Sequence, residues 1–145
     1  MWFVWLIIGF LVLKFLVHLA RKRLIVSANR YQRAFEYLPH SIVSEAMPHQ
    51  LRTLEQQRNF LLKVKDMLLS EHVPIPKTRA GMQVHAKVAF AAARCMERSG
   101  GSYNELASFA ATVLQGITVT EGTDYFDSNP DLRSLANRSY LENGF

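Results

Sequence analysis

The feature that most constrains this chain is a long apolar run near its N-terminus, WFVWLIIGFLVLKFLVHLA, over residues 2–20. As an α-helix rising about 1.5 Å per residue, the run is about 28 Å long, which matches the hydrocarbon core of a bilayer. Tryptophans at one end and a basic block at the other are typical of the two edges of a membrane span. These membrane-interface residues are Trp2, Trp5, Arg21, Lys22 and Arg23. The run therefore predicts a transmembrane anchor with a basic stop over residues 1–23.

The basic block also sets the expected orientation of the span. Three cations follow the apolar run directly and no Lys or Arg precedes it, so the positive-inside rule places the N-terminus outside and residues 21–145 in the cytoplasm. A cleaved signal peptide is the alternative, because Val26, Ser27 and Ala28 resemble a small-residue cleavage site. Its basic segment would lie on the wrong side of the apolar core, and a single cysteine fits a reducing compartment. We therefore expect a single-pass membrane protein in contact with the lipid bilayer.

Two ionisable side chains interrupt the apolar run. Lys14 and His18 are four residues apart, so they share one face of the helix. We expect Lys14 to extend its ammonium to the headgroups, with His18 already in the interface, since one span cannot enclose an ion path. The alternative is that this face contacts a second transmembrane helix.

The rest of the chain has helical periodicity, and we expect an all-α fold in which the span continues into a small cytoplasmic helical bundle. The predicted parts are a juxtamembrane amphipathic helix over 24–38, a cytoplasmic helical domain over 39–117, and an acidic C-terminal loop with a short helix over 118–145. The amphipathic helix should end at Pro39, because proline lacks an amide donor and disfavours helix in the residue before it. Asn129 as the cap, Pro130 as the first helical residue and Asp131 in the first turn predict a short C-terminal helix through about Leu141.

Two helices joined by a glycine-containing turn form the clearest local pattern. Residues 79–98 predict a mostly buried helix, and the following SGGS provides glycines that end it. Ser102 and Glu105 match a capping box, which should start a helix running to about Gln115. Residues 79–117 therefore predict an αα-hairpin, and the β-like ITVT at its end is expected to be loop.

The helix predicted over residues 48–71, with Pro48 as its first residue, has two apolar stripes. Six leucines share an arc of roughly 120° on the helical wheel, which is typical of a core face. They are Leu51, Leu54, Leu61, Leu62, Leu68 and Leu69. On nearly the opposite side lie Phe60, Val64 and Met67. This second stripe is either sandwiched within the bundle or exposed as a partner-binding surface, and both interpretations remain open.

No catalytic or metal-ligating residues and no cofactor are predicted. No two of the five histidines lie at the three- or four-residue spacing of a helical metal site, and the chain has no nucleophile elbow or phosphate-binding loop. The single Cys95 is expected to be a small buried apolar residue. His85 projects into an apolar helix face, where we expect a neutral histidine bonded to a carbonyl group. A small helical enzyme with a site near His85 remains an alternative.

Charge is distributed unevenly along the chain. Residues 1–100 carry 15 Lys or Arg against 6 Asp or Glu, whereas residues 101–145 carry 2 against 6. Lys87, Arg94 and Arg98 fall on one strip of a predicted helix and are a possible anion-binding set. Without interleaved aromatic residues or a helix-turn-helix pattern, a membrane-anchored nucleic-acid-binding module is the weaker alternative, and a solvated face is expected.

These observations together favour a non-catalytic function. A membrane anchor, a second apolar stripe and a basic body with an acidic tail are features of a scaffold or accessory subunit. We expect such a protein to dock protein partners at the cytoplasmic face of a membrane complex, with no small-molecule substrate.

Overall fold

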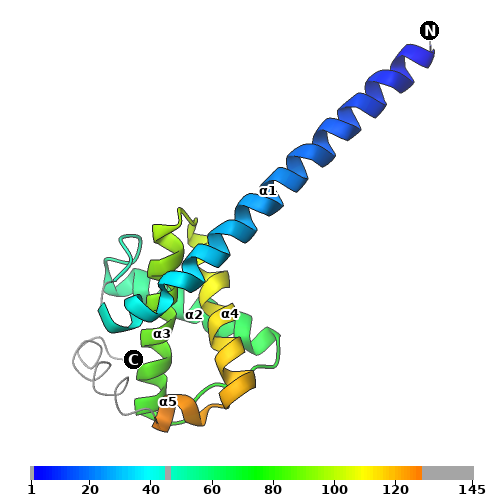
Figure 1. The fold of residues 1–145 in the computed structure, drawn as a ribbon. Helices are drawn as coiled ribbons and strands as arrows, with labels where there is room; N and C mark the ends of the chain where they lie inside the picture. Colours follow the sequence, from blue (N-terminus) through cyan, green and yellow to red (C-terminus); the bar gives the residue numbers. More distant parts are fainter. Residues whose placement is uncertain (1, 45–46, 129–145) are drawn as a thin grey trace.

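The computed structural model describes residues 2–44 and 47–128, and within these residues the chain is all-α, as predicted. The helices are α1 (Trp2–Ser44), α2 (Leu54–Ser70), α3 (Arg79–Arg98), α4 (Tyr103–Glu121) and α5 (Asp124–Ser128). The first half of α1 stands away from the other helices, which gather around its second half (Figure 1). The short helix predicted from Asn129 lies outside the described residues.

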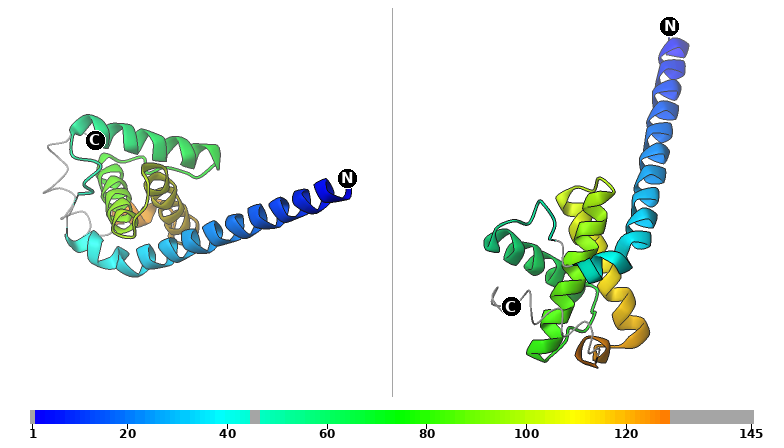
Figure 2. Two further views of the ribbon diagram at one scale, coloured as in Figure 1. Left: turned by 90° about the horizontal axis from the view of Figure 1, so that it is seen from above. Right: turned by 60° about the vertical axis from the view of Figure 1, so that its left-hand side comes forward.

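Helix α1 joins the apolar run to the packed helices without a break. Its second half crosses α3 and α4 (Figure 2), and its first buried side chain among those described is Ala34. Tyr31 and Phe35 both meet the ring of Phe109 edge to face, with centroid distances of 5.5 and 4.8 Å. Aromatic pairs of this geometry add to the free energy gained by burial, so they fasten α1 onto α4.

The predicted end of this helix at Pro39 is wrong, because α1 continues through Pro39 to Ser44. Proline within a helix costs about 3 kcal/mol through the lost hydrogen bond and the ring clash. Here the ring of Pro39 is exposed, while Leu38 and Ile42 pack against the core and Ser41 is buried. Tertiary packing on both sides of the proline therefore offsets its local cost.

Helix α3 is the central element, because it packs against both α1 and α4 and also contacts α5 and α2. Its bounds confirm the predicted helix over residues 79–98. Thr78 caps its first turn by accepting a hydrogen bond from the amide of Gly81 at 3.0 Å, and Gly100, with φ of +83°, turns the chain after its last residue. The alanines from Ala89 to Ala93 are buried, which lets neighbouring helices approach α3 closely.

Helix α4 begins as predicted but is longer than predicted. The capping box between Ser102 and Glu105 is present. The ITVT segment was expected to be loop, but it is helical and α4 ends only at Glu121. Thr118 is buried and donates a hydrogen bond to the carbonyl of Leu114 at 2.8 Å, so packing on the core overrides the β-propensity of this segment.

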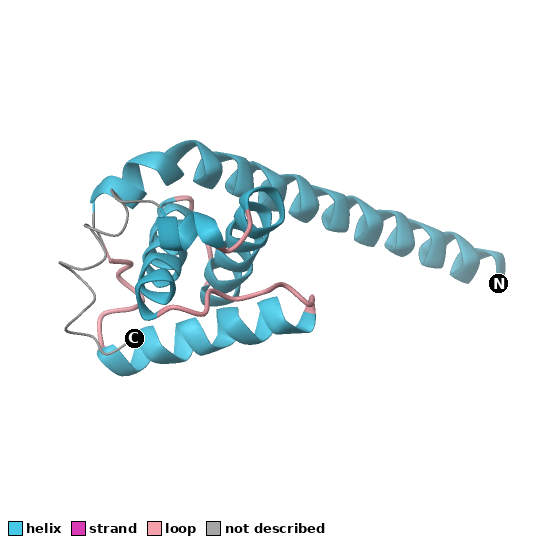
Figure 3. Ribbon diagram, turned by 90° about the horizontal axis from the view of Figure 1, so that it is seen from below, coloured by secondary structure: helices cyan, strands magenta, loops and turns pink. Residues whose placement is uncertain are grey.

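Helix α2 lies across one side of the α3–α4 pair, and the connector that follows it runs back alongside (Figure 3). The predicted start at Pro48 is wrong, because α2 begins at Leu54. Pro48 is buried in a turn whose carbonyl accepts the amide of Leu51 at 3.1 Å. Thr53 and Gln56 then form a capping box, which sets the start of the helix.

Candidate functional site

The predicted membrane-interface residues are all exposed along the projecting half of α1. They are Trp2, Trp5, Lys14, His18, Arg21, Lys22 and Arg23. Within the described residues, α1 is the one helix long and apolar enough to cross a membrane. The ammonium of Lys14 lies 5.9 Å from the centroid of the Phe10 ring on the preceding turn. The part of the chain that the structure describes therefore contains one candidate span.

The stripe predicted to bind partners is part of the core. Phe60 is fully buried, Val64 is 1% exposed and Met67 packs partly buried against the core. The ring of Phe60 stacks on Phe90 at a centroid distance of 5.9 Å and meets Tyr103 at 6.3 Å. The prediction that Phe60, Val64 and Met67 form a partner-binding surface is therefore wrong, because side chains packed between α2 and its neighbours are not accessible to a partner.

The leucine stripe, predicted to be core, is instead divided between the core and the surface. Leu51 and Leu68 are buried, whereas Leu54, Leu62 and Leu69 are 55%, 51% and 53% exposed. These three leucines share their face of α2 with Arg58 and Lys65, both also exposed. The surface of α2 is therefore an apolar stripe with two cations, which is unusual for a helix that already buries another face.

A hollow of about 310 Å³ adjoins this stripe, between α2, the connector and α3. Its lining consists of Arg58, Leu61, Leu62, Val64, Lys65, Ile75, Met82, His85 and Ala86. The charged side chains of this lining are both cations, and the remainder is largely apolar. We define the exposed stripe Leu54, Arg58, Leu62, Lys65 and Leu69 together with this hollow as the α2–α3 groove.

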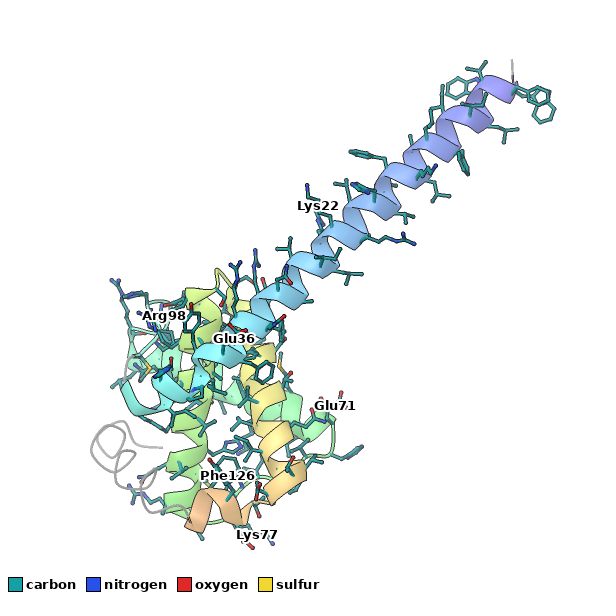
Figure 4. The ribbon with its side chains drawn as sticks, in the orientation of Figure 1. Lys22, Glu36, Glu71, Lys77, Arg98 and Phe126 are labelled. Atoms are coloured by element: carbon teal, nitrogen blue, oxygen red, sulfur yellow. The ribbon has the colours of Figure 1, made fainter. Side chains whose placement is uncertain are left out.

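His85 forms part of the inner wall of the hollow. Burial lowers the pKa of His85 to about 4, so its imidazole is neutral at pH 7. The ring meets Phe126 of α5 edge to face at 4.9 Å (Figure 4 labels Phe126). The expected hydrogen bond is missing at one nitrogen, since Nε2 is buried without a partner among the described residues. The lining includes no carboxylate that would pair with His85 as an acid–base couple.

The basic strip predicted on α3 does not form a solvated anion-binding surface. Lys87 is only 1% exposed, so it lies inside the protein. Arg94 donates a hydrogen bond to Glu97 at 2.9 Å, and the guanidinium of Arg98 lies 5.9 Å from the ring centroid of Tyr37. The assignment of these three side chains as a shared anion site is corrected, because a helix at the centre of a bundle has no continuous solvent face.

Glu97 has a structural task in this region. Burial alone would raise the pKa of its carboxyl group, but hydrogen bonds from the amides of His49 and Gln50 and the guanidinium of Arg94 outweigh burial, so the pKa is lowered. The hydrogen bonds from the amides of His49 and Gln50 to the Glu97 carboxylate are 2.8 and 3.0 Å long. The ionised carboxylate therefore ties the turn before α2 to the end of α3.

A second hollow, of about 420 Å³, lies where α1 leaves the apolar run and meets the start of α4. Its lining consists of Leu19, Lys22, Arg23, Val26, Arg30 and Glu105. Arg30 Nη1 and Glu105 Oε1 form an ion pair at 2.8 Å. Sequence analysis missed this site because its carboxylate lies 75 residues from its arginine. We call it the juxtamembrane hollow.

Cys95 is buried, as predicted, and donates a hydrogen bond from its Sγ to the hydroxyl of Ser41 at 3.0 Å. Burial raises the pKa of the thiol, which disfavours the nucleophilic thiolate. Across residues 2–44 and 47–128, no three His, Cys, Asp or Glu side chains come together as a potential metal site.

Comparison of the chain with models of protein families, with curated proteins and with solved structures finds no match.

Proposed function

We propose that this chain is a membrane-anchored, non-catalytic scaffold or accessory subunit that docks a protein partner at the cytoplasmic face of a membrane complex. In this proposal the first half of α1 is a single-pass span with its N-terminus outside. The helices around α3, including the αα-hairpin of α3 and α4, form the cytoplasmic bundle. The observation that carries the proposal is the α2–α3 groove, an apolar surface with cations on a helix whose other face is core.

The chemistry of the groove favours an amphipathic helix with acidic residues as its occupant. Arg58 and Lys65 are seven residues apart, so they lie two turns, or about 10 Å, apart along α2. Acidic side chains two turns apart on a partner helix would match this spacing, with apolar side chains between them facing Leu62 and the hollow. Recognition of an amphipathic helix in an apolar groove is a recurrent binding mode.

The groove also provides apolar area at the position expected for a binding hot spot. Leu62 and Met82, from α2 and α3, both line the hollow and are each more than 40% exposed. Large side chains that fill such a hollow usually contribute most of the binding free energy of an interface. Cations at the rim contribute mainly to specificity and to the association rate.

The test is purification of the tagged full-length chain in mild detergent from the cells that produce it. Proteins that elute in stoichiometric amount are compared between the wild type and the double variant Leu62→Glu/Met82→Glu. We expect at least a tenfold loss of these proteins in the double variant, because two buried charges are introduced at the centre of the interface. Cross-linking from Lys65 should join the groove to a partner segment with helical apolar periodicity and acidic residues.

Val119→Glu is the matched control. Val119 is 77% exposed on α4, so it is an exposed apolar side chain outside the groove. The control should retain the co-purifying proteins, and all variants should keep wild-type helicity and melting temperature. Equal loss in the control, or retention in the double variant, would contradict docking at the α2–α3 groove.

A further inference from the structure

The juxtamembrane hollow has the composition and position of a lipid-binding site. We propose that it binds the phosphate group of one anionic phospholipid headgroup. This inference rests on the membrane anchoring in the proposed function, and it concerns a different surface from the α2–α3 groove.

The first argument is the position of the hollow along α1. Its α1 residues begin with Leu19, at the end of the apolar run, and continue with Lys22 and Arg23 directly after it. At about 1.5 Å per residue these cations lie within a few ångström of the end of the hydrocarbon core, and so within the headgroup layer. Figure 4 shows Lys22 on α1 between the projecting half and the packed half of the helix.

The second argument is that the residues share one face. On a helical wheel of 100° per residue, the five α1 residues of the hollow fall within an arc of roughly 100°. They are Leu19, Lys22, Arg23, Val26 and Arg30. Helical side chains lean toward the N-terminus of their helix, which here is the membrane side. The cations of this face are therefore directed toward the layer where lipid phosphates lie.

The third argument is the charge within the hollow. Three cations face one carboxylate, that of Glu105, and the Arg30–Glu105 ion pair consumes one charge of each sign. Lys22 and Arg23 remain, which matches the one or two negative charges of a lipid phosphate. Arginine binds phosphate oxygens through its planar set of donors, and lysine binds them as a point charge. Leu19, at the membrane side of the hollow, provides apolar contact for the start of the acyl chains.

Glu105 acts as a positioning residue in this arrangement. Its Oε1 accepts hydrogen bonds from Arg30 at 2.8 Å and from the amide and hydroxyl of Ser102 in the capping box. The same carboxylate thus holds both Arg30 and the start of α4. The start of α4 forms one wall of the hollow, so the site exists only when the bundle is docked on α1.

The experiment uses the full-length chain in neutral detergent, with native mass spectrometry to count bound lipids. Short-chain phosphatidylglycerol and phosphatidylcholine are added separately. We expect one phosphatidylglycerol to bind at least tenfold more tightly than phosphatidylcholine. The variants Lys22→Gln and Arg23→Gln should each reduce that preference at least threefold.

Arg21→Gln is the matched control, because Arg21 carries the same charge at the same depth but lies on the opposite face of α1, outside the hollow. The control should keep the preference for phosphatidylglycerol. Equal loss in Arg21→Gln would overturn the proposal in favour of diffuse attraction between the basic segment and anionic lipid. Competition by inorganic phosphate alone at similar concentration would overturn it in favour of a free-anion site.

Fractionation separates failure of this inference from failure of the proposed function. A chain that sediments with membranes but shows no preference for phosphatidylglycerol contradicts the headgroup site alone. A chain found in the soluble fraction contradicts the anchoring, and both proposals then fall.

Discussion

At the scale of single residues, His85 is an ionisable side chain whose surroundings disfavour its charged form. Its imidazole is wedged against the Phe126 ring, and one of its nitrogens is buried without a partner among the described residues. The nearby cations Arg58 and Lys65 line the same hollow, so a positive charge on His85 would have no compensating partner there. The neutral form is therefore a condition of native packing.

This environment predicts an acid-sensitive stability. The pKa of His85 is about 4 in the folded chain and about 6.5 when unfolded, so the unfolded state binds the extra proton as pH falls through this window. Folding stability should decrease from pH 7 toward pH 4, by up to about 3 kcal/mol from this group. His85→Leu removes the titration and fits the apolar wall. The measurement is the melting temperature of both proteins from pH 7 to pH 4.

The wild type should lose stability relative to His85→Leu as pH falls, and the difference should level off below about pH 4. If the melting temperatures of the wild type and His85→Leu changed equally from pH 7 to pH 4, this would contradict a neutral buried His85. The imidazole resonance of His85 in NMR provides an independent check, since it should stay constant between pH 5 and pH 7.

Sequence reasoning worked best at this scale where the signal is local. The Ser102–Glu105 capping box was predictable, because both partners lie within four residues of each other. Local sequence could not predict whether Phe60 or Leu62 faces the core, because both stripes of α2 are apolar. Contacts of Phe60 with Phe90 and Tyr103 decide it, and those residues are 30 and 43 positions away in the sequence.

At the scale of elements, the turn between α3 and α4 shows how close packing fixes a connection. A Cβ atom on Gly101 would lie 2.4 Å from Met96 Cγ and 3.0 Å from the Met96 carbonyl oxygen. Gly116, inside α4, has open space where a Cβ atom would stand. Gly101 therefore has no room for a larger side chain, whereas Gly116 can accept one.

Alanine substitution at these two glycines should change stability in opposite directions. Gly101→Ala should destabilise the fold by about 1–3 kcal/mol, because the backbone of Met96 cannot move without shifting the end of α3. Gly116→Ala should stabilise it by about 0.5–1 kcal/mol through helix propensity. Thermal unfolding of both variants is compared with that of the wild type. An unchanged or raised melting temperature in Gly101→Ala would contradict close packing of this turn, and a lowered one in Gly116→Ala would contradict the open space around Gly116.

Prediction of whole elements depended on whether their ends are marked locally. The bounds of α3 were predicted correctly, since Thr78 caps its start and glycines follow its end. The ends of α1 and α4 were predicted too early, because Pro39 and the ITVT segment oppose a helix locally while their neighbours are held by packing on the core. Such packing contacts have no signature in a short stretch of sequence.

At the scale of the whole molecule, the apolar run and the packed helices are separable. Among the described residues, no core side chain precedes Ala34. The apolar run was evident from the sequence, whereas both hollows were not, because each is formed by helices distant in the chain.

Removal of residues 1–20 should therefore leave a folded protein. We expect the chain 21–145 to be soluble and helical, with a cooperative transition within about 5 °C of the full-length chain, equivalent to roughly 1 kcal/mol. Circular dichroism with size-exclusion chromatography measures this. Aggregation or a gradual, non-cooperative transition would show that the apolar run contributes to the core. Full-length protein in detergent is the reference.

The unbroken course of α1 makes the anchor a lever. Between Ala20 and Ala34 the helix has no loop or glycine, so nothing in this stretch can act as a swivel. Transmembrane helices tilt by about 20° on average, and a change of that size would displace a point 30 Å along the axis by roughly 10 Å. In a chain anchored as proposed, membrane thickness would thus set the direction in which the α2–α3 groove faces, and two membranes of different thickness would present it to a partner at different angles.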